Sequence, residues 1–227
     1  MVRKAVDLGN LRSPCYRRWR GQLIHPLEEA RMFFEGKGPV PDTLRRLAET
    51  LRSAGIPHIF MGATAVYAYG YERTTRDVDI CMRREDLERF RRDLVGRVYE
   101  AVPGRSRRFV DTATGVTVDV LIAGEIAGNT RKQREVLFPD PSEAIQVDDL
   151  PLVSLPRLIE LKLVTWRLKD WADVIELIRE RCLDESFGDQ FNPLVRQAYL
   201  QCYDQKLEED RYNPEDRDAP PDCQPTQ

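Results

Sequence analysis

Two aspartates, Asp77 and Asp79, are separated by one residue in a segment that alternates with apolar positions. Side chains of an extended strand alternate between its faces, so both carboxylates would point the same way, about 6.5–7 Å apart along the chain, with Val78 and Ile80 facing the core. Two carboxylates on one surface repel each other and are costly to desolvate unless a cation lies between them. Mg²⁺ suits this position because it prefers oxygen ligands and substrate phosphates.

A third carboxylate, Asp119, lies in the apolar segment 115–122, where the valines at 116, 118 and 120 share the opposite face. If this strand lies beside the one that carries Asp77 and Asp79, three carboxylates meet on one patch, enough to hold two metal ions about 3.5–4 Å apart. Such a site can perform phosphoryl or nucleotidyl transfer, since one ion lowers the pKa of an attacking hydroxyl and the other neutralises the leaving pyrophosphate.

A turn of small residues, Gly62-Ala63-Thr64, precedes the two aspartates and opens a predicted helix over 63–70. Backbone N–H groups at a helix start can face a phosphate. The same residues could also form an ordinary tight turn between a strand and a helix.

Arg73 and Arg76 flank the aspartates. They could form weak surface ion pairs with them or reach a triphosphate, and we expect one of the two arginines to bind phosphate. The structural alternative for Asp77 and Asp79 is that they are solvent-facing acids that discourage pairing at a sheet edge.

Taken together, these motifs resemble the nucleotidyltransferases of the DNA-polymerase-beta-like superfamily: a hydrophobic residue, two small residues, a spacer, Asp-x-Asp and a distant third acid. Thirteen residues, 64–76, form the spacer. The phrase Arg-x-Thr-x-Asp-x-Asp over 73–79 and the helix at 162–173 are more similar still to small bacterial nucleotidyltransferases that resemble AbiEii-type toxins. The resemblance covers about residues 40–182 and departs at Ala63, where the family usually has Gly or Ser; Thr64 could supply the missing hydroxyl.

The resemblance implies an enzyme that binds an NTP with two Mg²⁺ ions. In this interpretation Asp77 and Asp79 hold the ions, Asp119 completes the site and helps to activate the acceptor hydroxyl, and Gly62 with Thr64 cradles the phosphates.

Lys162 is predicted to balance the phosphate charge, although on its apolar helix face it could instead extend to water. Asp170 could belong to the site, begin a helix favourably, or pair with Lys162 or Arg167.

The acceptor is left open between a protein hydroxyl, a tRNA end and a small molecule such as an aminoglycoside. Toxin-like action on RNA or protein, with an antitoxin partner, follows from the resemblance alone. A second hypothesis is an inactive nucleotide-binding or partner-binding module of the same fold, an antitoxin or regulator, for which Ala63 is the hint. A metal-dependent glycosyltransferase would also use Asp-x-Asp, but normally after a longer domain than the 76 residues that precede Asp77.

Composition sets the frame. The 227 residues carry a net charge of −3, so no overall basic field indicates nucleic-acid binding. A chain of this length buries about 70% of its unfolded surface, enough for one core. Five cysteines without a Cys-x-x-Cys pair favour a reducing compartment and give no zinc site. No run of 18 apolar residues and no apolar leader is present, so we expect a cytoplasmic protein without a membrane span.

The predicted fold is α/β, specifically a nucleotidyltransferase fold with a short mixed sheet, helices on one side and a C-terminal helical part that closes the cleft. We expect an N-terminal extension, partly flexible, over 1–40, a catalytic core over 41–150, a helical part over 151–207 and an acidic flexible tail over 208–227. The basic N-terminal arm could touch RNA or be a solvated extension. The pattern predicts helices at 42–54, 63–70, 84–95, 155–167, 170–181 and 192–207, and strands at 57–61, 77–82, 107–112 and 116–122, with a further short strand at 144–147.

Overall fold

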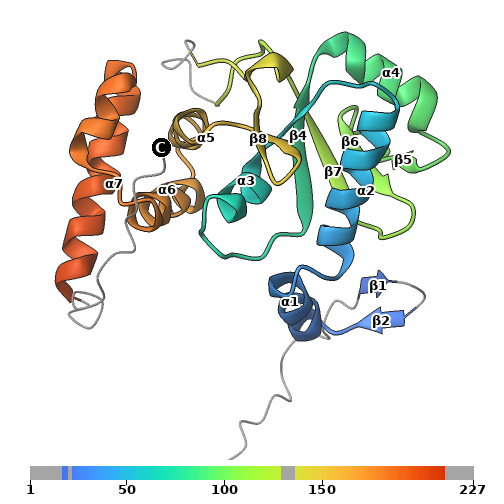
Figure 1. Cartoon of the computed structure of the whole chain (residues 1–227), viewed down its shortest axis with the longest axis horizontal. Helices are drawn as coiled ribbons and strands as arrows, with labels where there is room; N and C mark the ends of the chain where they lie inside the picture. Colours follow the sequence, from blue (N-terminus) through green and yellow to red (C-terminus); the bar gives the residue numbers. More distant parts are fainter. Residues whose placement is uncertain (1–16, 20–21, 129–135, 213–227) are drawn as a thin grey trace, which may run out of the picture.

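A seven-stranded mixed sheet forms the centre of the protein (Figure 1). The computed structural model describes residues 17–19, 22–128 and 136–212. The strands follow the spatial order β5 (Tyr99–Ala101), β6 (Arg108–Asp111), β7 (Thr117–Ile122), β4 (Asp77–Met82), β3 (Ile59–Phe60), β9 (Leu150–Leu152) and β8 (Ile145–Val147). The β4–β7 and β3–β9 pairs are parallel, and the other neighbours are antiparallel.

In the central strand pair, β4 and β7, apolar side chains lie on one face and aspartates lie on the other. Val78 and Ile80 of β4 are fully buried, as is Val118 of β7. They pack under α2 (Pro39–Ser53) and α4 (Arg84–Leu94), which cover this face of the sheet. The aspartates between these apolar positions must therefore emerge on the opposite face.

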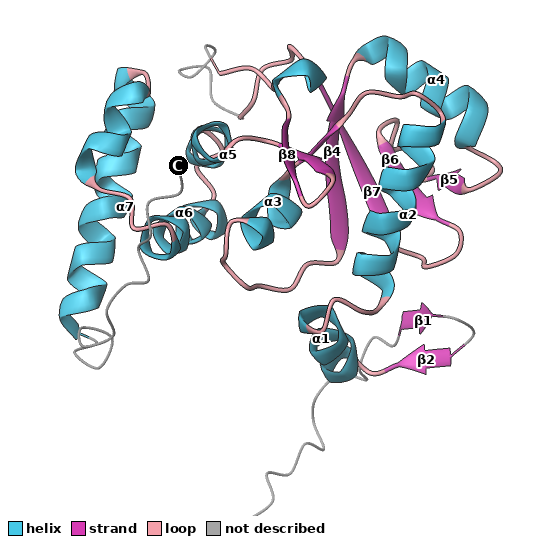
Figure 2. Ribbon diagram, in the orientation of Figure 1, coloured by secondary structure: helices cyan, strands magenta, loops and turns pink. Residues whose placement is uncertain are grey.

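A second apolar core lies between the opposite face of the sheet and a second group of helices (Figure 2). Its apolar residues come from α3 (Gly62–Ala68), α5 (Leu155–Leu163), α6 (Leu168–Glu180) and α7 (Pro193–Tyr212). Tyr69 anchors α3 to the loop before α5, since its hydroxyl donates to the Val153 carbonyl at 2.8 Å. These helices leave the acid-bearing strands β4 and β7 accessible along one side.

The predicted α/β class, with a mixed sheet and a C-terminal helical part, is confirmed. The strand over 77–82 has the predicted bounds. The expectation of helices on one side of the sheet was wrong, because α2 and α4 cover one face while α3 and the C-terminal helices cover the other. The sequence did not predict β5, β9, the hairpin of β1 (Arg17–Trp19) and β2 (Gln22–Ile24), or α1 (Pro26–Phe34). These missed strands are three residues each, too short for an alternating pattern to stand out.

Two predicted helix ends were wrong for identifiable reasons. The helix expected to reach 167 ends at Leu163, and Trp166 takes a left-handed backbone with φ of 56° that interrupts it. At the other end of this region, α7 continues to Tyr212 instead of 207. Arg179 of α6 pairs with Glu209 at 3.1 Å and Asp210 at 3.4 Å, which holds acidic residues of the predicted tail in the helix. The rest of that tail lies outside the described residues.

Cys81 and Cys202 carry free, buried thiols, whereas Cys182 is disulfide-bonded, which departs from the expectation of reduced cysteines. Burial raises the pKa of both free thiols to about 12, so neither is a reactive thiolate. Within the described ranges, no helix has the length and apolar character needed to cross a membrane.

Candidate active site

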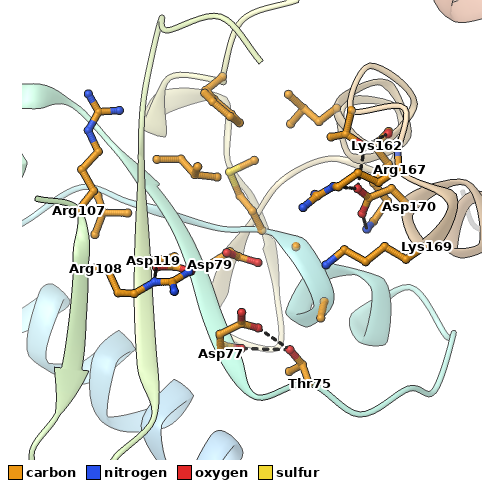
Figure 3. A pocket seen from close by; sticks show the side chains of 18 of the residues that line it. Thr75, Asp77, Asp79, Arg107, Arg108, Asp119, Lys162, Arg167, Lys169 and Asp170 are labelled. Carbon is orange, nitrogen blue, oxygen red and sulfur yellow. Dashed lines mark hydrogen bonds and ion pairs between the residues drawn. The ribbon is translucent and has the colours of Figure 1, made fainter. Parts of the chain in front are cut away.

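Asp77, Asp79 and Asp119, named here the acidic triad, face one cleft of about 700 Å³ (Figure 3). Asp79 and Asp119 are directly opposite each other on the parallel strands β4 and β7, and Asp77 is opposite Thr117. Because residues two apart share a strand face, the register brings all three carboxylates to the same polar surface. The sequence-based expectation that the third acid would join the first two is thus met by strand pairing.

Gly62 lies against Asp79 at the start of α3. A Cβ atom at this position would overlap the Asp79 carboxylate and lie 2.8 Å from its Cγ, so only glycine fits. Gly62 also has φ of 59°, in the left-handed region that favours glycine. Ala63 is not among the described residues with positive φ, so the missing second glycine of the motif removes no backbone freedom that this turn uses.

The local charge around Asp79 favours a bound cation or a proton. Burial raises the pKa of Asp79 to about 6, and the negative charges of Asp77 and Asp119 add to the effect. Lys162 and Lys169 act in the opposite direction but do not cancel it. When a cation binds beside a carboxylate with a raised pKa, it stabilises the ionised form of that carboxylate.

Two members of the acidic triad already have protein partners. Arg108 on β6 donates from Nε and Nη2 to the two carboxylate oxygens of Asp119, each at 2.6 Å. Thr75 donates from its hydroxyl to Oδ1 of Asp77 at 2.7 Å. Arg108 stands directly opposite Asp119 in the β6–β7 ladder, which explains the two-pronged contact.

Lys162 lies in a second ionic group, named here the lysine cluster: Lys162, Asp170, Asp173, Arg73 and Arg167. Its Nζ contacts Asp173 at 2.6 Å and Asp170 at 3.2 Å, and only 5% of the residue is exposed. Arg73 pairs with Asp173 at 2.7 Å, and Arg167 pairs with Asp170 at 2.5 Å. The predicted role of Lys162 as a free phosphate ligand therefore needs correction, because two aspartates already neutralise its charge.

The expected pairing of Asp170 with Lys162 or Arg167 occurs with both residues. Burial alone would raise the pKa of Asp170, but the charge of Lys162, the hydroxyl of Thr165 and the charge of Arg167 together lower it. Asp170 is thus an ionised, buried structural acid at the edge of the cleft.

The other predicted phosphate ligands divide between two places. Gly62, Ala63 and Arg73 line the cleft, although Arg73 is held by Asp173. Thr64 is absent from the lining, and Arg76 lines a separate, smaller hollow beside α1 and α2. The structure therefore does not support phosphate contacts by Thr64 or Arg76.

Several cleft residues escaped the sequence reasoning. Lys169 extends from the start of α6 toward Asp79, and Arg105, Arg107 and Arg108 line the opposite wall (Figure 3). Arg108 depends on the length of the hairpin loop: Asp111 pairs with Val116 across the loop 112–115, which sets residue 108 opposite residue 119, whereas a two-residue Thr114-Gly115 turn would have set it opposite residue 121. The position of Lys169 depends on how α6 packs against α5.

The cleft as a whole combines an acidic floor with basic walls. Four of its lining side chains are acidic and seven are cationic, the latter being Arg73, Arg105, Arg107, Arg108, Lys162, Arg167 and Lys169. A polyphosphate carrying divalent cations matches this arrangement, because the cations meet the floor and the phosphates meet the walls.

The donor set of the acidic triad fits Mg²⁺, which prefers carboxylate oxygens and substrate phosphates. Among the residues with described positions, no three acidic, histidine or cysteine side chains are already grouped as a metal centre. At Asp119 both carboxylate oxygens accept hydrogen bonds from Arg108. The tight approach of Gly62 and the unfavourable ionisation of Asp79 are the features that indicate a cation here.

No protein-family model and no curated protein matches the chain. Among solved structures, it is similar to a candidate nucleotidyltransferase from H. pylori, at 16% identity and a TM-score of 0.41, over 75% of this chain and 80% of that one. It is also similar to the antibiotic-resistance factor ANT(2'')-Ia, at 19% identity and a TM-score of 0.40, over 75% of this chain and 96% of that one. Likenesses this weak assign neither family nor activity, so the functional argument rests on the site itself.

Proposed function

We propose that the protein is a Mg²⁺-dependent nucleotidyltransferase that moves an NMP group from an NTP to a hydroxyl acceptor. The observation that carries the proposal is the convergence of three carboxylates from two adjacent parallel strands on the floor of a basic cleft, beside a glycine where a Cβ atom would overlap the Asp79 carboxylate. Three carboxylates are enough to hold two divalent cations.

In the proposed reaction the acceptor oxygen attacks the α-phosphorus of the NTP, the bond to the bridging oxygen breaks, and pyrophosphate leaves. Bound divalent cations would neutralise the phosphates and make the acceptor hydroxyl more acidic. A carboxylate oxygen of Asp119 accepts the proton of that hydroxyl. Asp77 and Asp79 hold the cations, and Gly62 allows the substrate to approach β4 closely.

The basic walls position the anionic substrate. Lys169 makes no side-chain hydrogen bond or ion pair within the described part of the chain and extends toward Asp79, so it is the best-placed lysine for a phosphate. Its role replaces the one predicted for Lys162. The toxin activity and an antitoxin partner stay predictions.

The alternative of an inactive nucleotide-binding module depended on Ala63, which lacks both the backbone freedom of glycine and the hydroxyl of serine. The turn takes its positive φ at Gly62, so the backbone freedom is kept, but Thr64 does not line the cleft and supplies no hydroxyl there. Activity and binding separate the two hypotheses directly: the module would bind NTP without releasing pyrophosphate.

The test uses each labelled NTP with Mg²⁺ and total cell lysate, and measures pyrophosphate release and transfer of label. The wild-type protein should label an acceptor, and Asp79→Ala should abolish Mg²⁺-dependent NTP consumption. Asp189→Ala is the matched control, because Asp189 is an exposed acid paired with Arg196 on the α7 side of the molecule. Wild-type turnover in Asp79→Ala would reject the proposal.

A further inference from the structure

The Arg108–Asp119 contact places a guanidinium where the proposed active site needs a metal ion. Both carboxylate oxygens of Asp119 accept from Arg108 at 2.6 Å, so neither is free for another cation in this arrangement. The other two acids of the triad, Asp77 and Asp79, lie on the same face of the neighbouring strand β4, so their negative charges also attract this guanidinium.

The fold does not require this ion pair. The side chain of Arg108 is 46% exposed and that of Asp119 is 21% exposed. Exposed ion pairs contribute little to stability, and the backbone ladder of β6 and β7 already fixes the two strands. Arg108 is therefore able to change partners without disturbing the sheet.

A single arginine neutralises the acidic triad incompletely. One positive charge faces three carboxylates, and both hydrogen bonds of that guanidinium within the described residues go to Asp119. A divalent cation matches this charge better, so the two cations compete for Asp119.

Arg108 has a suitable second position on the same wall. Arg105, in the turn before β6, lines the cleft, and its side chain makes no hydrogen bond or ion pair with the described residues. Arg107 shares Glu125 with Arg84, so one carboxylate serves two arginines. A guanidinium released here would find no free acid on the wall, and its planar fork fits two oxygens of a phosphate.

We propose that Arg108 exchanges its partner, leaving Asp119 when a divalent cation binds and then, beside Arg105, binding a phosphate group of the substrate. The inference rests on the proposed function, since it requires the acidic triad to bind a divalent cation. The phosphate belongs either to the NTP or to a nucleic-acid acceptor. The exchange makes the basic wall available only in the metal-bound protein.

The first test is a titration of the metal-free full-length protein with Mn²⁺, followed by the electron paramagnetic resonance signal of free Mn²⁺. Arg108→Gln should bind Mn²⁺ about fivefold more tightly than the wild type, because the competing ion pair is gone. Arg108→Lys keeps the charge without the fork and should lie between the two. Arg196→Gln is the matched control and should leave Mn²⁺ affinity unchanged, since it pairs with Asp189 away from the cleft.

The second test measures the affinity of the Mn²⁺-loaded protein for a non-hydrolysable NTP and, separately, for a short single-stranded RNA. Arg108→Gln should weaken one of these ligands about tenfold or more, since charge-assisted phosphate contacts are lost. Weakening of the NTP alone assigns the phosphate to the triphosphate, and weakening of the RNA alone assigns it to the acceptor.

A gain in Mn²⁺ affinity together with a loss of phosphate affinity supports the exchange, because a purely structural role would not move the two in opposite directions. Equal Mn²⁺ affinity in wild type and Arg108→Gln overturns the inference while leaving the proposed function intact. Unchanged affinity for both phosphate ligands also overturns it. Failure of the wild type to bind Mn²⁺ overturns the proposed function and this inference together.

Discussion

The acidic triad and the lysine cluster line the same cleft but differ in how far their charges are balanced by neighbouring residues. In the lysine cluster, two aspartates share three cationic groups, and Lys162 and both aspartates are nearly excluded from solvent. In the acidic triad, three carboxylates share one exposed arginine, and Asp79 ionises with difficulty. The lysine cluster is complete within the protein, whereas the acidic triad needs a positive partner from outside.

This difference separates a structural ionic group from a ligand site. Both contain Asp residues beside basic ones, so the sequence alone does not distinguish the structural group from the ligand site. Buried ion pairs whose partners are all present hold helices together, and breaking them leaves an uncompensated charge. A group of like charges on a cleft floor destabilises the free protein, and a bound ligand of opposite charge relieves that repulsion.

The largest expected effect comes from breaking the lysine cluster. Lys162→Met removes the buried cation that Asp170 and Asp173 share and leaves each with only a more exposed arginine, so the free energy of unfolding should fall by about 3 kcal/mol, the lower end for a broken buried pair. Urea unfolding followed by circular dichroism measures this change. Lys37→Met is the control: its pair with Glu35 is exposed, and the loss should stay below about 1 kcal/mol. Equal losses in the two variants would contradict the structural role of the lysine cluster.

Removing a charge from the acidic triad should raise the free energy of unfolding instead of lowering it. Moving the pKa of Asp79 from 3.8 to about 6 means that its ionisation costs at most about 3 kcal/mol in the folded, metal-free protein. Asp79→Asn should therefore raise the free energy of unfolding at pH 7 by up to that amount.

The pH dependence follows from the same raised pKa. Between pH 4 and 6 the folded protein binds the Asp79 proton more tightly than the unfolded chain, so this contribution to stability decreases as the pH rises through that window. Urea unfolding at several pH values in EDTA should show the decrease in the wild type and a smaller one in Asp79→Asn. If the free energy of unfolding changed with pH equally in both proteins, Asp79 would not be the acid with the raised pKa.

A smaller effect is expected at the turn beside the acidic triad. Gly62→Ala forces a left-handed backbone on alanine, which costs about 1–2 kcal/mol, and pushes a methyl group into the Asp79 carboxylate. Stability should fall by about that amount and Mg²⁺ affinity should fall with it. Gly36→Ala, at a glycine outside the cleft with similar φ and open space around it, tests the backbone part alone. If Gly36→Ala weakened Mg²⁺ binding as much as Gly62→Ala, the contact with Asp79 would not be the cause.

The sequence predicted the parts of the site that depend on local pattern. Alternation over 77–82 and 116–122 identified both strands and the polar side on which the aspartates lie. That the two strands are neighbours was only a condition of the sequence argument, and their parallel direction was not predicted, because no local pattern states which strands pair. Gly62 was singled out as part of a turn, but the reason that only glycine fits there is its contact with Asp79, 17 residues along the chain.

The parts that were missed depend on how separate elements pack. Lys162 was predicted to face phosphate because its helix face is apolar, but the neighbouring α6 brings Asp170 and Asp173 to its ammonium group. Arg76 lies next to Asp77 in sequence, yet it lines a different hollow. Proximity in sequence therefore misled the prediction for arginine, whereas strand register brought Arg108 to Asp119.

The most direct test of the central claim is a calorimetric titration of a non-hydrolysable NTP into the full-length protein, once with Mg²⁺ and once with EDTA. The account predicts saturable binding in Mg²⁺ that is lost in EDTA and lost in Asp77→Asn with Mg²⁺ present. Binding of equal affinity with and without Mg²⁺, or undiminished binding in Asp77→Asn, would contradict the assignment of the acidic triad as a metal-dependent nucleotide site.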